Sequence, residues 1–145
     1  MMKTEGSLSR SPLHLLHRAG QSAEELFQTE VGDADLTPRQ LAVLGTVAEH
    51  EGLSQTDIVE RTGIDRSTMT DIVRRLSKKG LLQRRRTKDD ARAYAVKLSE
   101  EGHKLLRTVG PLAKKVDQQI LEALPGAKGD FLERLQAIVD KLQPT

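Results

Sequence analysis

The chain has 145 residues, a net charge of +2 and no cysteine, which favours one domain in a reducing compartment, expected to be the cytoplasm. The missing cysteine excludes disulfides, thiolate metal ligands and thiol redox sensing. The sequence has neither a run of about 18 apolar residues nor the pattern of a secretory signal, so no membrane segment is expected.

Two helices are predicted in the first third of the chain. From Pro12 to about Glu30, apolar residues recur every three or four positions, as on the buried stripe of an amphipathic helix. The segment VGDADLTP interrupts this pattern. Thr37 followed by Pro38 is typical of a helix start, and it predicts a second helix from Pro38 to about His50.

The next segment has the pattern of a helix-turn-helix. Ser54 is the expected N-cap of a short helix over residues 55–62, and Gly63 interrupts that helix after two turns. Asp65 is the expected cap of a longer helix that ends near Gly80. A short helix, a turn with glycine and a longer helix predict a helix-turn-helix, whose second helix enters the major groove of DNA.

Positive charge is concentrated in this part of the chain. Residues 61–92 contain eleven lysines and arginines against four acidic residues, a local net charge of +7 that leaves −5 for the rest. A basic block of this kind in a nearly neutral chain is typical of a surface that binds a polyanion. A solvated basic face without a partner is the simpler alternative.

The outward face of the longer helix is polar. The residues expected to contact the major groove are Arg66, Ser67, Thr68, Thr70, Arg74 and Arg75. Arginine can donate to O6 and N7 of guanine, and hydroxyl groups adapt to either kind of base edge. Asp71 either accepts from N4 of cytosine or orients Arg74 or Arg75. Ser54 and Thr56 begin the shorter helix, where hydroxyl and free N–H groups can bind a DNA phosphate.

Residues 81–86 and 93–98 are predicted to form two short strands of a β-hairpin, joined by a charged loop. A hairpin at this position lies beside the duplex, where its loop can follow the phosphates or enter the minor groove. Asp90 can hold Arg92 through a bidentate ion pair and so fix it for insertion. The expected DNA contacts of this wing are Arg84, Arg86, Lys88, Asp90 and Arg92.

Two further helices are predicted at the C-terminal end. Ser99 caps the first, which Pro111 should kink or split, and PGAKGD separates it from a last helix over residues 130–142. The apolar stripes of both helices and of residues 13–27 exceed what a small winged domain can cover, so pairing of two chains is expected. The expected interface residues are Leu16, Phe27, Leu112, Val116, Ile120, Phe131, Leu135 and Ile138.

Residues 36–102 resemble the MarR family of winged helix-turn-helix transcriptional regulators. The most specific pieces are LTPRQ at 36–40, KGL at 79–81, DAR at 90–92 and LSEEG at 98–102. The resemblance implies a mainly α fold with a small β-hairpin wing. It implies a single MarR-type domain over residues 1–145, with dimerisation helices at 12–30 and 103–142 around the winged helix-turn-helix.

The same resemblance implies an obligate homodimer on double-stranded, palindromic DNA, most simply a repressor. It places the wing contact at Asp90 and Arg92 and the major-groove contacts within residues 65–75. Asp71 departs from the family pattern, because many relatives carry a basic or neutral residue there, which leaves the operator sequence open.

Members of this family are often released from DNA by a small molecule, commonly a phenolic or aromatic carboxylate and in some cases an acyl-CoA thioester. The resemblance therefore implies such an effector, and His14, His17 and Arg18 are the polar candidates to bind it. Solvated residues on a helix surface are the simpler interpretation. His14 and His17 could also share a Zn²⁺ with a third ligand, but no clustered ligand set is present, so no metal or cofactor is expected.

Two other classes of function compete with a DNA-binding regulator. A hydrolase or transferase would need a nucleophile–base pair, a glycine-rich phosphate loop or paired carboxylates in an apolar context, and the sequence has none of these, so an enzyme is not expected. A helical interaction module could bind an acidic protein through the basic face. Affinity for a palindrome that falls steeply with salt would exclude that module.

Overall fold

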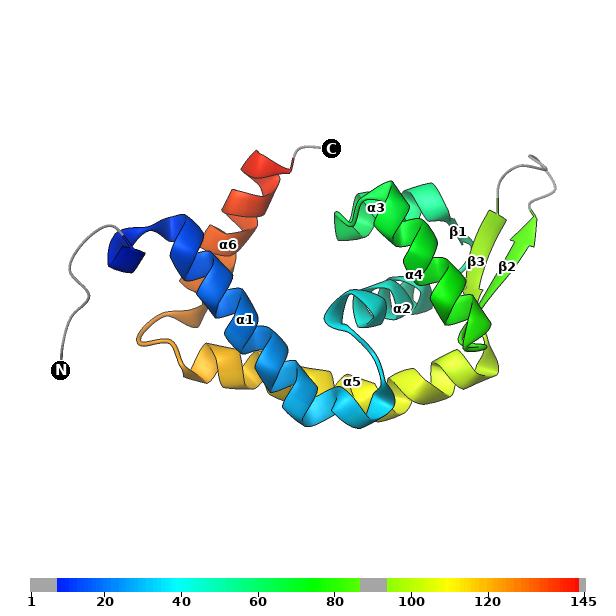
Figure 1. Ribbon diagram of the computed structural model, residues 1–145, viewed down its shortest axis with the longest axis horizontal. Helices are drawn as coiled ribbons and strands as arrows, with labels where there is room; N and C mark the ends of the chain where they lie inside the picture. Colours follow the sequence, from blue (N-terminus) through cyan, green and yellow to red (C-terminus); the bar gives the residue numbers. More distant parts are fainter. Residues whose placement is uncertain (1–7, 87–93, 144–145) are drawn as a thin grey trace.

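The structure is a computed structural model that describes residues 8–86 and 94–143 (Figure 1). Its helices are α1 (Pro12–Val31), α2 (Pro38–Glu49), α3 (Gln55–Thr62), α4 (Arg66–Lys78), α5 (Glu100–Glu122) and α6 (Lys128–Leu142). Its strands are β1 (Leu53–Ser54), β2 (Leu82–Arg86) and β3 (Tyr94–Leu98), and single 3-10 turns lie at Leu8–Arg10 and Gly32–Ala34. The predicted fold class, mainly α with a small β wing, is confirmed.

The elements form two regions. The winged unit, residues 36–98, contains α2, α3, α4 and the sheet, and the arm consists of α1, α5 and α6 (Figure 1). Helix α5 runs from the winged unit along one side of the molecule, with α1 packed across it, and α6 returns beside the first half of α1. Within the described ranges, the helices are too short or too polar to cross a membrane.

Side-chain caps explain where the helices begin. Thr37 Oγ1 accepts from the Gln40 N–H at 3.1 Å while Gln40 Oε1 accepts from the Thr37 N–H at 3.1 Å, so both backbone donors are satisfied. Ser54, Asp65 and Ser99 cap α3, α4 and α5, as predicted. The left-handed backbone at Gly63 (φ 72°) makes the sharp turn between α3 and α4.

The sheet has the strand order β1-β3-β2, and both pairs are antiparallel. The hairpin of β2 and β3 is confirmed, whereas the two-residue strand β1 was not predicted. The register pairs Leu82 with Leu98 and Arg86 with Tyr94. Because paired residues share a face of the sheet, Arg86 and Tyr94 continue the face whose Leu82 and Leu98 are buried.

The hydrophobic core lies mainly in the winged unit. Leu44, Ile58 and Met69 are fully buried there, together with Val73 and Leu76. From the arm, this core receives Phe27, Val31 and Val109, with Leu112 packed against it. The arm therefore contributes to the core along one side of α1 and α5, and α6 has no buried residue within its length.

Helix α5 continues through Pro111, so the prediction that Pro111 could split it is wrong. A proline removes one helical hydrogen bond and leaves the carbonyl four residues earlier without its donor. That carbonyl belongs to Arg107, and both Arg107 and Pro111 lie on the exposed side of the helix, where water can satisfy the oxygen.

The first turn of α5 is held against the end of α4. The Ser99 N–H donates to the Leu81 carbonyl at 3.1 Å, and the Ser99 hydroxyl donates to the Gly80 carbonyl at 2.5 Å. Gly102 is buried directly beneath this junction, where a Cβ would collide with the Leu81 carbonyl oxygen. Only glycine allows this approach, so Gly102 fixes how closely the arm joins the winged unit.

Candidate nucleic-acid interface

Helix α4 presents a polar face to solvent and an apolar face to the core. Met69, Ile72, Val73 and Leu76 are buried, as their spacing predicts. The expected major-groove residues lie on the other sides of the helix: Arg66, Ser67, Thr70, Arg74 and Arg75 are exposed, and Thr68 is half-buried. A helix with this division can enter a groove without disturbing its own packing.

The hydroxyl groups of Ser67, Thr68 and Thr70, on the polar side of α4, are already engaged as donors. Ser67 Oγ and Thr68 Oγ1 donate to the two carboxylate oxygens of Asp65, at 2.9 and 2.8 Å. Thr70 Oγ1 donates to the Arg66 carbonyl at 2.9 Å and accepts from Gln55 of α3. Because their hydrogens are used within the protein, Ser67 and Thr68 present accepting lone pairs, which suit an amino group on a base edge.

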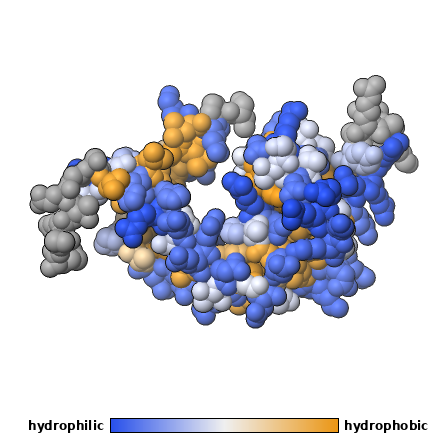
Figure 2. Space-filling model, in the orientation of Figure 1, coloured by the Kyte–Doolittle hydropathy of each residue, from blue (hydrophilic) through white to orange (hydrophobic). Residues whose placement is uncertain are grey.

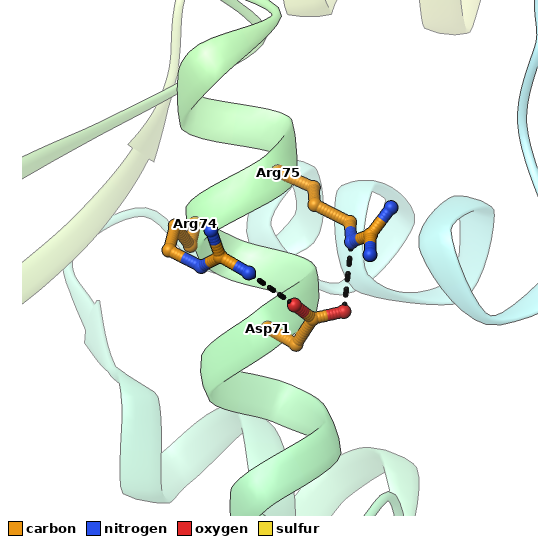
Figure 3. A network of polar contacts seen from close by, with 3 residues as sticks. All are labelled: Asp71, Arg74 and Arg75. Atoms are coloured by element: carbon orange, nitrogen blue, oxygen red, sulfur yellow. Dashed lines mark hydrogen bonds and ion pairs between the residues drawn. The ribbon is translucent and has the colours of Figure 1, made fainter.

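Asp71 binds both neighbouring arginines (Figure 3). Its Oδ1 accepts from Arg74 Nη2 at 2.6 Å and its Oδ2 accepts from Arg75 Nε at 2.8 Å. The hydrogen bond from Arg74 is the main cause that lowers the pKa of Asp71 below its ordinary value of 3.8. Of the two roles considered for Asp71, the free protein therefore adopts the one that orients arginine, and it orients both.

The start of α3 contains the two candidates for a phosphate contact. Ser54 Oγ accepts from the Asp57 N–H at 3.1 Å, and Asp57 Oδ2 accepts from the Ser54 N–H at 3.0 Å. The bond from the Ser54 backbone is the main cause that lowers the pKa of Asp57. Ser54 is thus half-buried in a capping box, whereas Thr56 is exposed and faces solvent.

The end of the hairpin next to the wing loop contains an aromatic residue, Tyr94, that sequence reasoning missed as part of the site. The guanidinium carbons of Arg84 and Arg86 lie 5.9 and 5.7 Å from the centre of the Tyr94 ring, close enough for cation–π attraction. The ring therefore restrains two of the predicted wing arginines. The cross-strand pairing of Arg86 with Tyr94 is the signal that could have revealed it. Lys88, Asp90 and Arg92 lie outside the described residues.

The arm contains two apolar cavities. A cavity of about 340 Å³ between α1, α2 and α5 is lined by apolar side chains that include Phe27, Leu41 and Val116, with Glu24 and Asp117 as its charged lining. A cavity of about 570 Å³ between α1, α5 and α6 is lined by Leu16, Ala19, Gly20, Ala23, Asp117, Ile120, Leu121, Phe131, Leu132 and Leu135. Either can hold an apolar group, and the first is bordered by negative charge.

The effector candidates on α1 lie away from these cavities. Leu16 and Gly20 face α5 and α6, and by helical spacing His14 and Arg18 lie on the opposite side of α1. His17 is exposed, and it lines neither cavity. Across residues 8–86 and 94–143, three or more metal-ligating side chains do not come together, so the zinc alternative gains no support.

The expected interface residues fall into two groups. Phe27 and Val116 are buried within one chain, and Leu112 packs on the core, so these three do not need a second chain to be covered. The others remain accessible: Leu16 and Ile138 are exposed, while Ile120, Phe131 and Leu135 are half-buried around the larger cavity. Any surface covered by a second chain therefore centres on α6 and the start of α1.

Comparison with known proteins agrees with this geometry. Residues 34–93 match the model of the MarR family. The HTH-type transcriptional repressor NicR of Pseudomonas putida is 30% identical over 128 residues, which cover 88% of this chain and 81% of NicR. The chain belongs to the MarR family. Since this family consists of DNA-binding transcriptional regulators, the chain is a regulator and not an enzyme.

Two solved structures are similar over nearly their whole length. The PcaV transcriptional regulator of Streptomyces coelicolor, in complex with its natural ligand, is 31% identical with a TM-score of 0.88, and the match covers 95% of this chain and 98% of PcaV. BpsR of Bordetella bronchiseptica, whose DNA binding is regulated by 6-hydroxynicotinic acid, is 28% identical with a TM-score of 0.84 over 94% and 98% of the two chains. Both are thus similar to this MarR regulator in arm and winged unit alike.

Proposed function

We propose that this MarR regulator is a repressor in the cytoplasm, which binds a palindromic operator as a homodimer and leaves it when a small molecule binds. The observation that carries the proposal is the exposed polar face of α4, which lies beside a basic hairpin. This face contains arginines and hydroxyl groups whose hydrogens are already donated to Asp65. The similarity to NicR, which is named a transcriptional repressor, supports repression over activation.

In this proposal, each part of the winged unit contacts a different part of the DNA. Arg66, Ser67 and Thr68 meet base edges near the start of α4, with Thr70, Arg74 and Arg75 further along. Thr56 and the capped Ser54 approach a phosphate. The wing contributes Arg84 and Arg86, held by Tyr94, together with Lys88, Asp90 and Arg92 of its loop.

The homodimer is supported by the apolar surface of the arm. Leu132, Val139 and Leu142 of α6 are exposed, in addition to Ile138, and Figure 2 shows the hydrophobic surface that they help to form over α6. A monomer rarely leaves such a patch in water. Two chains joined through their arms would place two α4 helices about 34 Å apart, the spacing of half-sites about 10 base pairs apart.

The smaller cavity is the proposed effector site, and the residues that line it restrict the chemical class of the effector. Its apolar walls suit an aromatic ring, and the carboxylates of Glu24 and Asp117 can accept from a phenolic hydroxyl. Both carboxylates would repel the phosphates of an acyl-CoA thioester. An aromatic carboxylate would need a cation, for which His14, His17 and Arg18 of the second chain are the candidates. A phenol is therefore the favoured effector.

The experiment is fluorescence anisotropy of the purified protein with DNA from upstream of its own gene and with a scrambled duplex, at two salt concentrations. Tight binding to the native fragment alone, released by a phenol, is the expected result. Equal weak binding to both duplexes would contradict the proposal and would favour the alternative, a basic helical module that binds an acidic protein.

A further inference from the structure

The surface of α4 that would face DNA includes an acidic residue, Asp71, whose negative charge is unfavourable next to phosphates. The buried residues Met69, Ile72, Val73 and Leu76 define the inner side of α4. At 3.6 residues per turn, the side directly opposite is occupied by Ser67, Asp71, Arg74 and Lys78. Asp71 therefore lies on the outward side of α4, half-buried beside the start of α2, where it adds a negative charge to the surface that would face DNA.

Both ion pairs of Asp71 are made within α4, with the two arginine side chains largely exposed and Asp71 itself 43% exposed. Exposed pairs of this kind add little to the stability of a protein. Two other acidic residues of the helix-turn-helix, Asp57 and Asp65, differ in this respect, because their carboxylates accept from backbone N–H groups at helix starts. Helix capping thus accounts for Asp57 and Asp65 but not for Asp71.

The carboxylate of Asp71 occupies one donor nitrogen of each arginine and draws both guanidinium groups toward itself. Arg74 uses Nη2 and Arg75 uses Nε, and the two guanidinium groups reach the carboxylate from either side (Figure 3). A phosphate that approaches either arginine has to compete with Asp71, and it is repelled by the same charge. Binding through phosphates alone is consequently weakened at the centre of α4.

We propose that Asp71 is a specificity-determining residue, which accepts from the amino group of one base in each half-site and penalises DNA that lacks this base. Cytosine N4 and adenine N6 are the amino groups exposed in the major groove. On any other sequence, Asp71 faces acceptor atoms or phosphates, and its two arginines stay withdrawn. This inference rests on the proposed function and names the residue that gives it selectivity.

The test compares Asp71→Asn with Asp130→Asn. Asp130 forms an exposed ion pair with Arg134, four residues later in α6, with Nε donating to Oδ2 at 2.9 Å. The two variants therefore make the same charge change and break the same type of pair, but only one lies on α4. Affinities for operator and scrambled DNA are measured by anisotropy at 50 and 200 mM salt, and circular dichroism confirms that both variants fold.

For Asp71→Asn we expect scrambled DNA to bind about fivefold more tightly, with a salt dependence steeper by about 0.9 in log–log slope, as for one added phosphate contact. Operator binding stays equal or weakens, so the ratio of the two affinities falls about fivefold or more. Asp130→Asn leaves the ratio unchanged. Asp71→Glu, which keeps the charge, retains weak binding to scrambled DNA.

A second readout locates the base. Each base pair of the half-site is changed in turn, symmetrically in both half-sites, and wild type should discriminate strongly at one cytosine or adenine where Asp71→Asn is indifferent. Equal behaviour of Asp71→Asn and Asp130→Asn, in a protein whose wild type does select the operator, would overturn this inference alone. A wild type that does not distinguish operator from scrambled DNA would overturn the proposed function as well.

Discussion

The winged unit and the arm bury their apolar residues to very different degrees. In the winged unit the large aliphatic residues of α2, α3 and α4 are inside, and Leu44, Ile58 and Leu76 have no exposed surface. In the arm, α6 has no buried residue, and Leu142 keeps 74% of its surface in water. Both regions contain amphipathic helices, so the difference lies in what the apolar faces of these helices pack against.

The contrast teaches that helix formation and helix burial are separate properties of this sequence. Both α4 and α6 have an apolar side, yet only the apolar side of α4 is buried by neighbours in its own chain. The hydrophobic effect favours covering such a face. The arm therefore depends on a second chain in our proposal, whereas the winged unit is complete by itself.

The largest expected effect is on folding stability, and it tests whether the winged unit forms a complete hydrophobic core within one chain. Leu44→Ala should lower the free energy of unfolding by about 2–5 kcal/mol, because it leaves a cavity in a fully enclosed site. Leu142→Ala, at the exposed end of α6, is the matched control and should change it little in a dilute monomer. Urea unfolding followed by circular dichroism measures both, and equal losses would mean that the two regions are not different in this way.

The second prediction concerns the junction of the two regions. Gly102→Ala should destabilise the protein by about 1–3 kcal/mol, because its Cβ would push α5 away from the Leu81 carbonyl. Gly45→Ala, inside α2, has open space around the new Cβ and should stabilise by up to about 1 kcal/mol. Thermal unfolding of both variants should therefore give shifts of opposite sign, and a shift of the same sign would refute the close approach.

The third prediction concerns the exposed face of the arm. Ile138→Asp should weaken the dimer about tenfold or more, since a charge would be buried without a partner at the proposed interface. Ala137→Asp places the same charge on another side of α6 and should leave the dimer intact. Sedimentation velocity over a range of concentrations measures the equilibrium. Unchanged dimerisation in Ile138→Asp would remove α6 from the interface.

The smallest effect is a dependence on pH that belongs to the winged unit. The pKa of Asp57 lies below its ordinary value of 3.8 in the folded protein, so its stabilising contribution is present above pH 3.8 and is lost as the pH falls through the folded pKa. Asp57→Asn should therefore show a weaker loss of stability between pH 5 and pH 3 than wild type. Urea unfolding at four pH values tests this, and parallel curves would contradict it.

Local patterns predicted most of the fold, because most of its elements are set by neighbouring residues. The caps at Thr37, Ser54, Asp65 and Ser99 and the turn at Gly63 need only a few adjacent positions, and all are present. The strand β1 was missed because two residues have no periodicity of their own and pair with β3 more than forty positions later. Helix α5 continues through Pro111 because Pro111 and Arg107 lie on the side of the helix that faces water, and local sequence does not show which side that is.

The candidate site was predictable in composition and less so in geometry. The basic face of α4 followed from the positions of its buried residues, and the pairing of Asp71 with arginine followed from their spacing. Tyr94 escaped notice because its contact with Arg84 and Arg86 requires the register of two strands. The acidic lining of the smaller cavity, from Glu24 and Asp117, could not be predicted, because it depends on how three helices pack in space.

The unbroken course of α5 has a mechanical consequence. One end of this helix is bonded at Ser99 to Gly80 and Leu81, just after α4, and Val116 lines the proposed effector cavity. At about 1.5 Å per residue, the 17 positions from Ser99 to Val116 span roughly 25 Å. A tilt of about 4° about Val116 would therefore move the Ser99 end by about 1.8 Å, beyond the tolerance of a hydrogen bond to a base edge. In the proposed function, a lever of this length would convert a small displacement at the effector cavity into a misfit at the operator.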